Sequence, residues 1–107
     1  LLGMPERPTA ILCSNDLLAL GVLSAARALN IQVPHELTVR GFDDVAQSGW
    51  PLIGLTTVHC DLPDLARESV GMLMRSMHDV EREPASELRR LPVSLVERAT
   101  HGRAFDE

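Results

Sequence analysis

The sequence predicts an α/β fold, in which a partial parallel sheet carries flanking helices. A short apolar run at 9–13 is typical of a buried strand, a helical pattern follows at 17–29, and a second run rich in β-formers occupies 37–42. A strand, a helix and a strand at this spacing form a βαβ unit, whose two strands pair in parallel.

Polar residues directly after the first strand predict where the first helix begins. Ser14, Asn15 and Asp16 are residue types that cap helices, because a side-chain oxygen accepts a hydrogen bond from an unpaired backbone N–H. The helix carries a wide apolar stripe, which predicts that it is covered on more than one side. Asn30 is suited to the left-handed residue that ends a helix.

The rest of the chain continues the same alternation and then becomes polar. The expected segments are a strand at 55–59, a helix at 61–79, a polar loop at 81–90 and a last strand at 91–96. Asp61 is placed to cap the second helix, and Pro63 sits early in it, where its missing N–H costs nothing. From Thr100 onward we expect a polar tail that frays.

Composition excludes several classes of protein. The 107 residues include 10 basic and 15 acidic ones, for a formal net charge of −5, and 45% are hydrophobic. This describes one globular domain at most, with no apolar run long enough for a membrane span. The acidic balance argues against a grip on nucleic acid by this chain itself. We expect a cytoplasmic protein without a disulfide scaffold or membrane partner, and a start at Leu1 suggests a piece of a longer chain.

Two polar clusters follow neighbouring strands of the expected sheet. Asn15 and Asp16 follow the first strand, and Asp43 and Asp44 follow the second. Parallel strands end at the same edge of a sheet, and ligands of open α/β sheets bind outside that edge. Carboxylate and amide groups suit the hydroxyls of a sugar or the N–H groups of a base. The same residues also fit simple capping of a helix and a turn, and the pattern leaves both interpretations open.

Catalytic and metal chemistry find little support in the sequence. An Asp-Asp pair also occurs in acidic phosphoacceptor pockets, but these need a lysine and this chain has none. His59 and Cys60 are neighbours on an expected strand, so their side chains point to opposite faces and do not easily share an ion. We expect no enzyme, no metal and no cofactor. Trp50 stands in a loop of glycine and proline, where it fits loop packing, a pocket wall or an interface.

Four blocks in a fixed order carry a resemblance to a known family. Residues 15–21 fit Asn-Asp-x-x-Ala-x-Gly, Val33-Pro34 precedes a strand and Gly-Phe-Asp-Asp at 41–44, residues 55–58 read Leu-Thr-Thr-Val, and residues 91–98 fit Leu-Pro-x-x-Leu-Val-x-Arg. Together they cover roughly residues 8–100. The chain resembles the C-terminal part of the effector-binding core of LacI/GalR-type bacterial transcriptional regulators.

The resemblance implies a partial Rossmann-like sheet from a core similar to periplasmic sugar-binding proteins. In that core two subdomains close over a small-molecule effector, and a dimer is joined to an N-terminal helix-turn-helix domain. Asn15 and Asp43 match positions that face the effector, and Asp16 and Asp44 would contact the effector or support the cleft. The resemblance also implies that the face near Leu20 and the loop around Trp50 would lie toward the dimer partner.

Residues 1–107 are therefore expected to be the C-terminal portion of such a domain, without the helix-turn-helix and the first half of the core. The helix from Pro63 and the strand from Leu91 would belong to the N-terminal subdomain, after a crossover near Thr57. The expected function is to sense a small polar effector, a sugar or related metabolite, in a homodimer that reaches operator DNA only through the absent domain. The alternatives are a periplasmic sugar-binding protein of a transporter and a truncated product without function.

Overall fold

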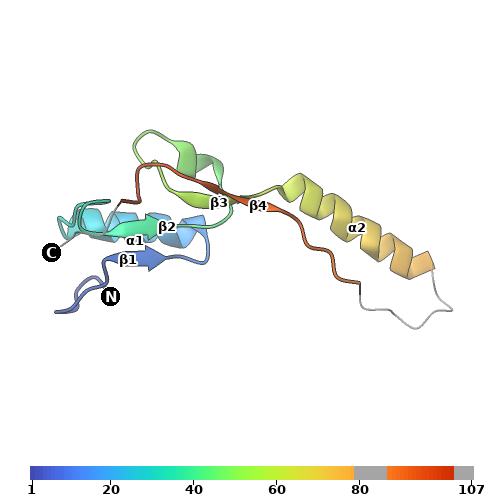
Figure 1. Ribbon diagram of the computed structural model, residues 1–107, viewed down its shortest axis with the longest axis horizontal. Coiled ribbons are helices and arrows are strands. Elements are labelled where there is room, and N and C mark those ends of the chain that lie inside the picture. The colour runs from blue at the N-terminus through green and yellow to red at the C-terminus, as the bar shows by residue number, and fades with distance from the viewer. Residues whose placement is uncertain (79–86, 103–107) are drawn as a thin grey trace. The chain divides into compact units, whose positions relative to one another are not determined.

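The computed structural model describes residues 1–78 and 87–102 of the chain (Figure 1). Its elements are β1 (Ala10–Leu12), α1 (Asp16–Ala28), β2 (Thr38–Arg40), the short 3-10 helix η1 (Ala46–Gly49), β3 (Thr57–Cys60), α2 (Leu62–His78) and β4 (Val93–Val96). The predicted α/β class and the order of helices and strands are confirmed, and the first two strands are shorter than the runs that predicted them.

The described residues fall into two compact units. Unit 1 contains residues 1–59 and 94–102, and unit 2 contains residues 60–78 and 87–93. The chain therefore leaves unit 1 directly after His59, two residues beyond the crossover expected near Thr57. It returns to unit 1 within β4.

The sheet of unit 1 is parallel, as the βαβ spacing predicts. β1 and β2 pair in the register Ala10–Thr38, Ile11–Val39 and Leu12–Arg40. On the other side of β2, single parallel bridges join Arg40 to Thr56 and Asp43 to His59. β2 therefore lies between β1 and the segment that leads into β3, and β3 pairs with β4. Three parallel segments run toward the same edge.

α1 begins and ends where the capping residues predict. Asn15 has extended backbone, and its Oδ1 accepts a hydrogen bond from the Leu18 N–H at 2.9 Å. Past the last turn, Asn30 has a φ of 56°, the left-handed stop expected there. The expected cover on more than one side is not found among the described residues, because Leu17 is 76% exposed.

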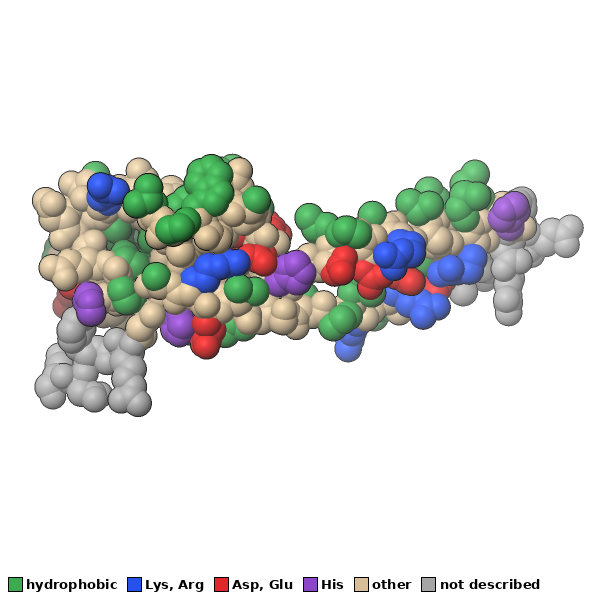
Figure 2. Space-filling view, turned by 90° about the horizontal axis from the view of Figure 1, so that it is seen from above, with side chains coloured by type: hydrophobic (Ala, Val, Ile, Leu, Met, Phe, Trp, Pro, Cys, Tyr) green, Lys and Arg blue, Asp and Glu red, His purple; other side chains and the backbone are tan. Residues whose placement is uncertain are grey.

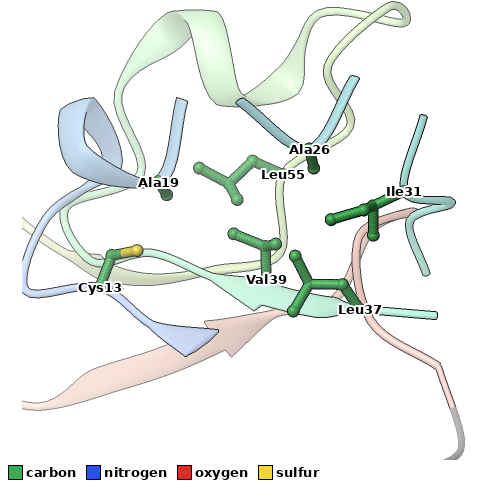
Figure 3. Close-up of a cluster of buried hydrophobic side chains, with 7 residues drawn as sticks. All are labelled: Cys13, Ala19, Ala26, Ile31, Leu37, Val39 and Leu55. Carbon is green, nitrogen blue, oxygen red and sulfur yellow. The ribbon is translucent and has the colours of Figure 1, made fainter. Parts of the chain in front are cut away.

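A small apolar core lies between α1 and the sheet (Figure 3). Leu37, Val39 and Leu55 are fully buried, and they face the small side chains of Ala19 and Ala26 on α1. Small residues on the helix let it approach the sheet closely. The whole buried cluster, which lies in unit 1, is Cys13, Ala19, Ala26, Ile31, Leu37, Val39 and Leu55.

The segment after β4 is built into unit 1, which corrects the expectation of a frayed tail from Thr100. Thr100 is only 3% exposed. Its Oγ1 donates to the Val39 carbonyl at 2.8 Å and accepts from the Thr56 N–H at 2.8 Å. The prediction was wrong because both partners are more than 40 residues away in the sequence. Residues 103–107 lie outside the described part.

α2 of unit 2 has the predicted start. Asp61 Oδ1 accepts from the Asp64 N–H at 2.9 Å, and Pro63 lies in the first turn. Among the described residues nothing buries any side chain of this helix. Figure 2 shows apolar side chains along α2 beside acidic and basic ones. The large apolar residues exposed on it are Leu62, Leu65, Val70, Leu73, Met74 and Met77.

Of the loop expected at 81–90, residues 81–86 lie outside the described part and residues 87–90 form no helix or strand. Glu87 is paired there with Arg75 of α2 and with Arg89. In the ranges 1–78 and 87–102, no helix has the length and apolar character needed to cross a membrane.

Candidate ligand-binding site

The structure brings Asn15 and Asp43 to the same edge of the parallel sheet. Beyond the ends of β1 and β2, the Cys13 N–H donates to the Arg40 carbonyl and the Asp16 N–H to the Phe42 carbonyl, both at 2.8 Å. The two chain segments therefore stay side by side past their strands. Asn15 and Asp43 both remain half-buried on these neighbouring segments.

Asn15 caps the helix with one end of its side-chain amide and keeps a second hydrogen-bonding group at the other end. The Leu18 N–H fixes which end of the amide faces the helix, because only the oxygen can accept from it. The Nδ2 amine then points elsewhere, and no partner for it is found within residues 1–78 and 87–102. Capping and ligand contact are therefore compatible at this residue.

Asp16 is fully buried and joins three segments of unit 1. Its Oδ2 accepts from the Val45 N–H at 3.0 Å and from Ser48 Oγ at 2.6 Å. Its Oδ1 accepts from Thr57 Oγ1 at 2.5 Å. With both oxygens occupied and no exposed surface, the carboxylate is placed to support the edge from below. Of the two roles that the sequence leaves open for Asp16, effector contact and cleft support, this geometry favours cleft support.

Gly41 explains how the Asp16 carboxylate fits beneath the edge. A Cβ at position 41 would lie 2.1 Å from Asp16 Oδ1 and 3.1 Å from Leu55 Cδ2. Only glycine allows the backbone to approach the carboxylate this closely. The glycine before Phe42-Asp43-Asp44 is thus required by packing.

The Asp43–Asp44 turn has an unusual backbone and a second set of contacts. Asp43 has a φ of 112° and Asp44 a φ of 56°. Asp44 Oδ1 accepts from Arg98 Nη2 at 2.7 Å, and its Oδ2 lies 3.1 Å from His59 Nδ1. Neither Arg98 nor His59 is among the site residues predicted from the sequence. The arginine that closes the fourth family block was the available signal.

The two residues expected at a dimer interface both lie in unit 1. Leu20 is half-buried on α1, and Trp50 is 55% exposed directly after η1. Backbone bonds from Ile53 and Gly54 to the Trp50 carbonyl, both 2.8 Å, make a tight turn of this loop. Leu52 at its tip is 98% exposed. The assignment of Leu20 and Trp50 to an interface stays a prediction.

Other chemical features of the described residues do not converge on this edge. No group of three or more His, Cys, Asp or Glu side chains in residues 1–78 and 87–102 is arranged to hold a metal ion. Burial raises the pKa of the Cys13 thiol, so it remains protonated at neutral pH. A hollow of about 380 Å³ runs along β1 and β2; its lining includes Thr9, Leu12, Pro34, Glu36 and Arg40, and neither Asn15 nor Asp43.

Polar side chains at the carboxyl edge of a parallel sheet, in a chain that crosses to a second unit and returns, define a class of α/β ligand-binding domains. The family described as periplasmic binding protein-like domain matches residues 1–101, and the chain belongs to this family. This confirms the fold that the four sequence blocks implied.

Curated relatives of the chain indicate which part of this family it resembles. The HTH-type transcriptional repressor PurR of Escherichia coli O139:H28 is 33% identical over 86 residues, which cover 80% of this chain and 25% of that protein. The chain thus spans about a quarter of the length of the curated relatives it matches. These curated relatives carry the name of a transcriptional repressor.

Solved structures agree with this assignment. A LacI-family regulatory protein from Corynebacterium glutamicum has a TM-score of 0.71 and 35% identity, covering 90% of this chain and 36% of that one. The Lac repressor dimer bound to operator and the anti-inducer ONPF has a TM-score of 0.72 and 35% identity, covering 88% and 32%. The predicted resemblance to part of the effector-binding core of LacI-family regulators is therefore confirmed.

Proposed function

We propose that this chain is the effector-sensing region of a LacI-family transcriptional regulator, and that Asn15 and Asp43 bind its effector. Residues 1–107 would form the C-terminal portion of the effector-binding domain. The whole protein would act in the cytoplasm as a homodimer that binds operator DNA through another domain. The observation that carries the proposal is the pair of half-buried polar side chains at the carboxyl edge of the sheet.

The hydrogen-bonding groups at this edge favour a small polar effector. Asn15 can donate through Nδ2, since its oxygen is occupied by the helix cap. The Asp43 carboxylate can only accept. A donor beside an acceptor matches a hydroxyl, which both accepts and donates, and we therefore propose a sugar or a related metabolite. The ring N–H of a base would satisfy Asp43 as well.

Effector binding would regulate the protein by shifting a population. A ligand changes the balance between two arrangements of a core only by the difference in its affinity for them. If a second ligand, such as operator DNA, also prefers one of the two arrangements, effector binding changes the affinity for that second ligand.

The proposal is tested by calorimetry on the intact protein with D-glucose, D-galactose, D-ribose, hypoxanthine and guanine as probes. Asp43→Gly removes the carboxylate while accepting the positive φ. It should weaken binding by about 1–3 kcal/mol, the cost of a lost buried partner. Asn15→Asp keeps the cap and removes the amide donor, so affinity should fall while stability is kept.

Glu6→Ala is the matched control, because Glu6 is an exposed acid before the amino end of β1. Its affinity should equal that of the unmodified protein. Unchanged affinity in both Asp43→Gly and Asn15→Asp would refute the proposed site, and so would the absence of binding to all five probes.

A further inference from the structure

We propose that Asp44, Arg98 and His59 form a turn clamp, which holds the Asp43–Asp44 turn in its left-handed conformation and so positions Asp43 at the ligand edge. The inference rests on the proposed function in one respect, that Asp43 contacts the effector. It assigns Asp44 and Arg98 as positioning residues.

The turn needs to be held because its backbone is unfavourable. Asp43 and Asp44 have φ values of 112° and 56°, and both are residues with a Cβ. L-residues rarely adopt a positive φ, and such conformations persist only where surrounding contacts enforce them. Two consecutive residues with positive φ therefore need more enforcing contacts than one.

The contacts of the turn clamp meet that requirement from two distant parts of the chain. Arg98 Nη2 donates to Asp44 Oδ1 at 2.7 Å across 54 residues, and His59 Nδ1 lies 3.1 Å from Asp44 Oδ2. The Asp44 side chain is only 17% exposed, so this pair is shielded from water more than a surface pair.

Arg98 is itself fixed, which makes it a rigid anchor. Its Nη1 donates to the Leu55 carbonyl at 2.8 Å, and its backbone N–H donates to Thr56 Oγ1 at 2.9 Å. One guanidinium thus joins a carbonyl and a carboxylate at once, and its planar fork fixes the directions of both hydrogen bonds. The Asp43 N–H donates to the Val58 carbonyl at 2.9 Å and completes the attachment of the turn.

The two adjacent aspartates therefore have different roles. Both Asp44 oxygens are engaged within unit 1. No such partner is found for the Asp43 carboxylate in the described part of the chain, and it stays half-buried at the edge. Asp43 is free to bind, and Asp44 is committed to holding the turn.

Glycine and alanine at position 44 separate a conformational role from direct ligand contact. Asp44→Ala removes the clamp and keeps a Cβ, so the turn relaxes, and affinity for whichever of the five probes binds should fall about tenfold or more. Asp44→Gly also removes the clamp but prefers the same backbone, so affinity should stay within about threefold. If Asp44→Gly loses as much as Asp44→Ala, the carboxylate contacts the probe directly and the proposal is overturned.

Amide exchange of the intact protein tests the clamp without any ligand. The Asp43 N–H should exchange faster in Asp44→Ala and in Arg98→Lys than in Asp44→Gly. The Cys13 N–H, bonded to the Arg40 carbonyl in the core, should be unchanged in all three and so reports folding. If Asp43 exchange in Asp44→Ala and in Arg98→Lys equals that in the unmodified protein, the clamp is overturned. If no probe binds, the proposed function fails while the exchange result still decides this inference.

Discussion

Unit 1 and unit 2 differ in what holds them together. Unit 1 has a closed apolar core, and its polar residues Asp16, Ser48, Thr56, Thr57 and Thr100 are buried with hydrogen-bond partners. The described residues of unit 2 form one capped helix and the short segment 87–93, which are joined by the ion pair of Arg75 with the exposed Glu87.

The difference shows that two helices with similar amphipathic patterns can differ in how much of their apolar face is buried. Both helices are amphipathic, yet within the described part of the chain α1 has buried residues and α2 has none. Surface ion pairs contribute at most about 1 kcal/mol each, so they do not replace a core. Unit 1 should therefore carry most of the stability of the 107-residue chain.

Shortening one leucine in each unit tests this comparison most strongly. Leu37→Ala in unit 1 should lower the free energy of unfolding by about 2–5 kcal/mol, because it opens a cavity around a fully buried side chain. Leu73→Ala in α2, where the leucine is 60% exposed, should change it by less than about 0.5 kcal/mol. Urea unfolding of the chain measures both. A large loss in Leu73→Ala would show that α2 is covered after all.

Two glycine substitutions sharpen the comparison within unit 1. Gly41→Ala should lower the free energy of unfolding by about 1–3 kcal/mol, because the new methyl group collides with the Asp16 carboxylate. A methyl group at position 21 on α1 meets nothing within 4 Å among the described residues, so Gly21→Ala should stabilise the protein by about 0.5–1 kcal/mol. Opposite shifts in the thermal midpoint are expected. Shifts of the same sign would mean that Asp16 is not fixed where the structure has it.

The smallest expected effect is the contribution of ion pairs to stability, and it should depend on pH in the same way in both units. The Gln32 backbone N–H and then Arg7 lower the pKa of Glu36, and Arg89 lowers that of Glu87, each from 4.5. A depressed acid pKa contributes stability that is present above pH 4.5 and is lost as the pH falls below it. Glu87 is exposed and Glu36 is only partly buried, so solvent screens both charges and the contribution is small. At pH 7, Glu36→Gln and Glu87→Gln should each have a slightly lower free energy of unfolding than the unmodified protein, and near pH 3 the difference should vanish. Urea unfolding at both pH values measures it. A difference that grows as the pH falls would contradict the expected sign.

Much of the local structure could be predicted from the sequence. Asn15, Asn30 and Asp61 adopt the cap positions that their side-chain chemistry predicts. The parallel pairing of β1 and β2 followed from the βαβ spacing. The polar pairs after the two strands were found for the same reason, since parallel strands end together.

The roles inside the site could not be predicted in the same way. Asn15 and Asp16 are neighbours in the sequence. Asn15 is half-buried, with an amide nitrogen that has no partner among the described residues, whereas Asp16 has no exposed surface. Asp43 and Asp44 likewise differ only in the partners that reach them. Arg98 and His59 were missed because their contacts join residues 54 and 15 positions apart.

The sequence by itself determined the α/β class, the starts of both helices and the edge at which polar groups meet. These depend on local backbone preferences, capping and the handedness of a βαβ connection, which act over a few residues or one turn of chain. Only the tertiary structure decided that Thr100 is buried, that Gly41 must lack a side chain and that Asp44 is clamped. Burial and ion pairing depend on which distant segments pack together, and local patterns do not encode that.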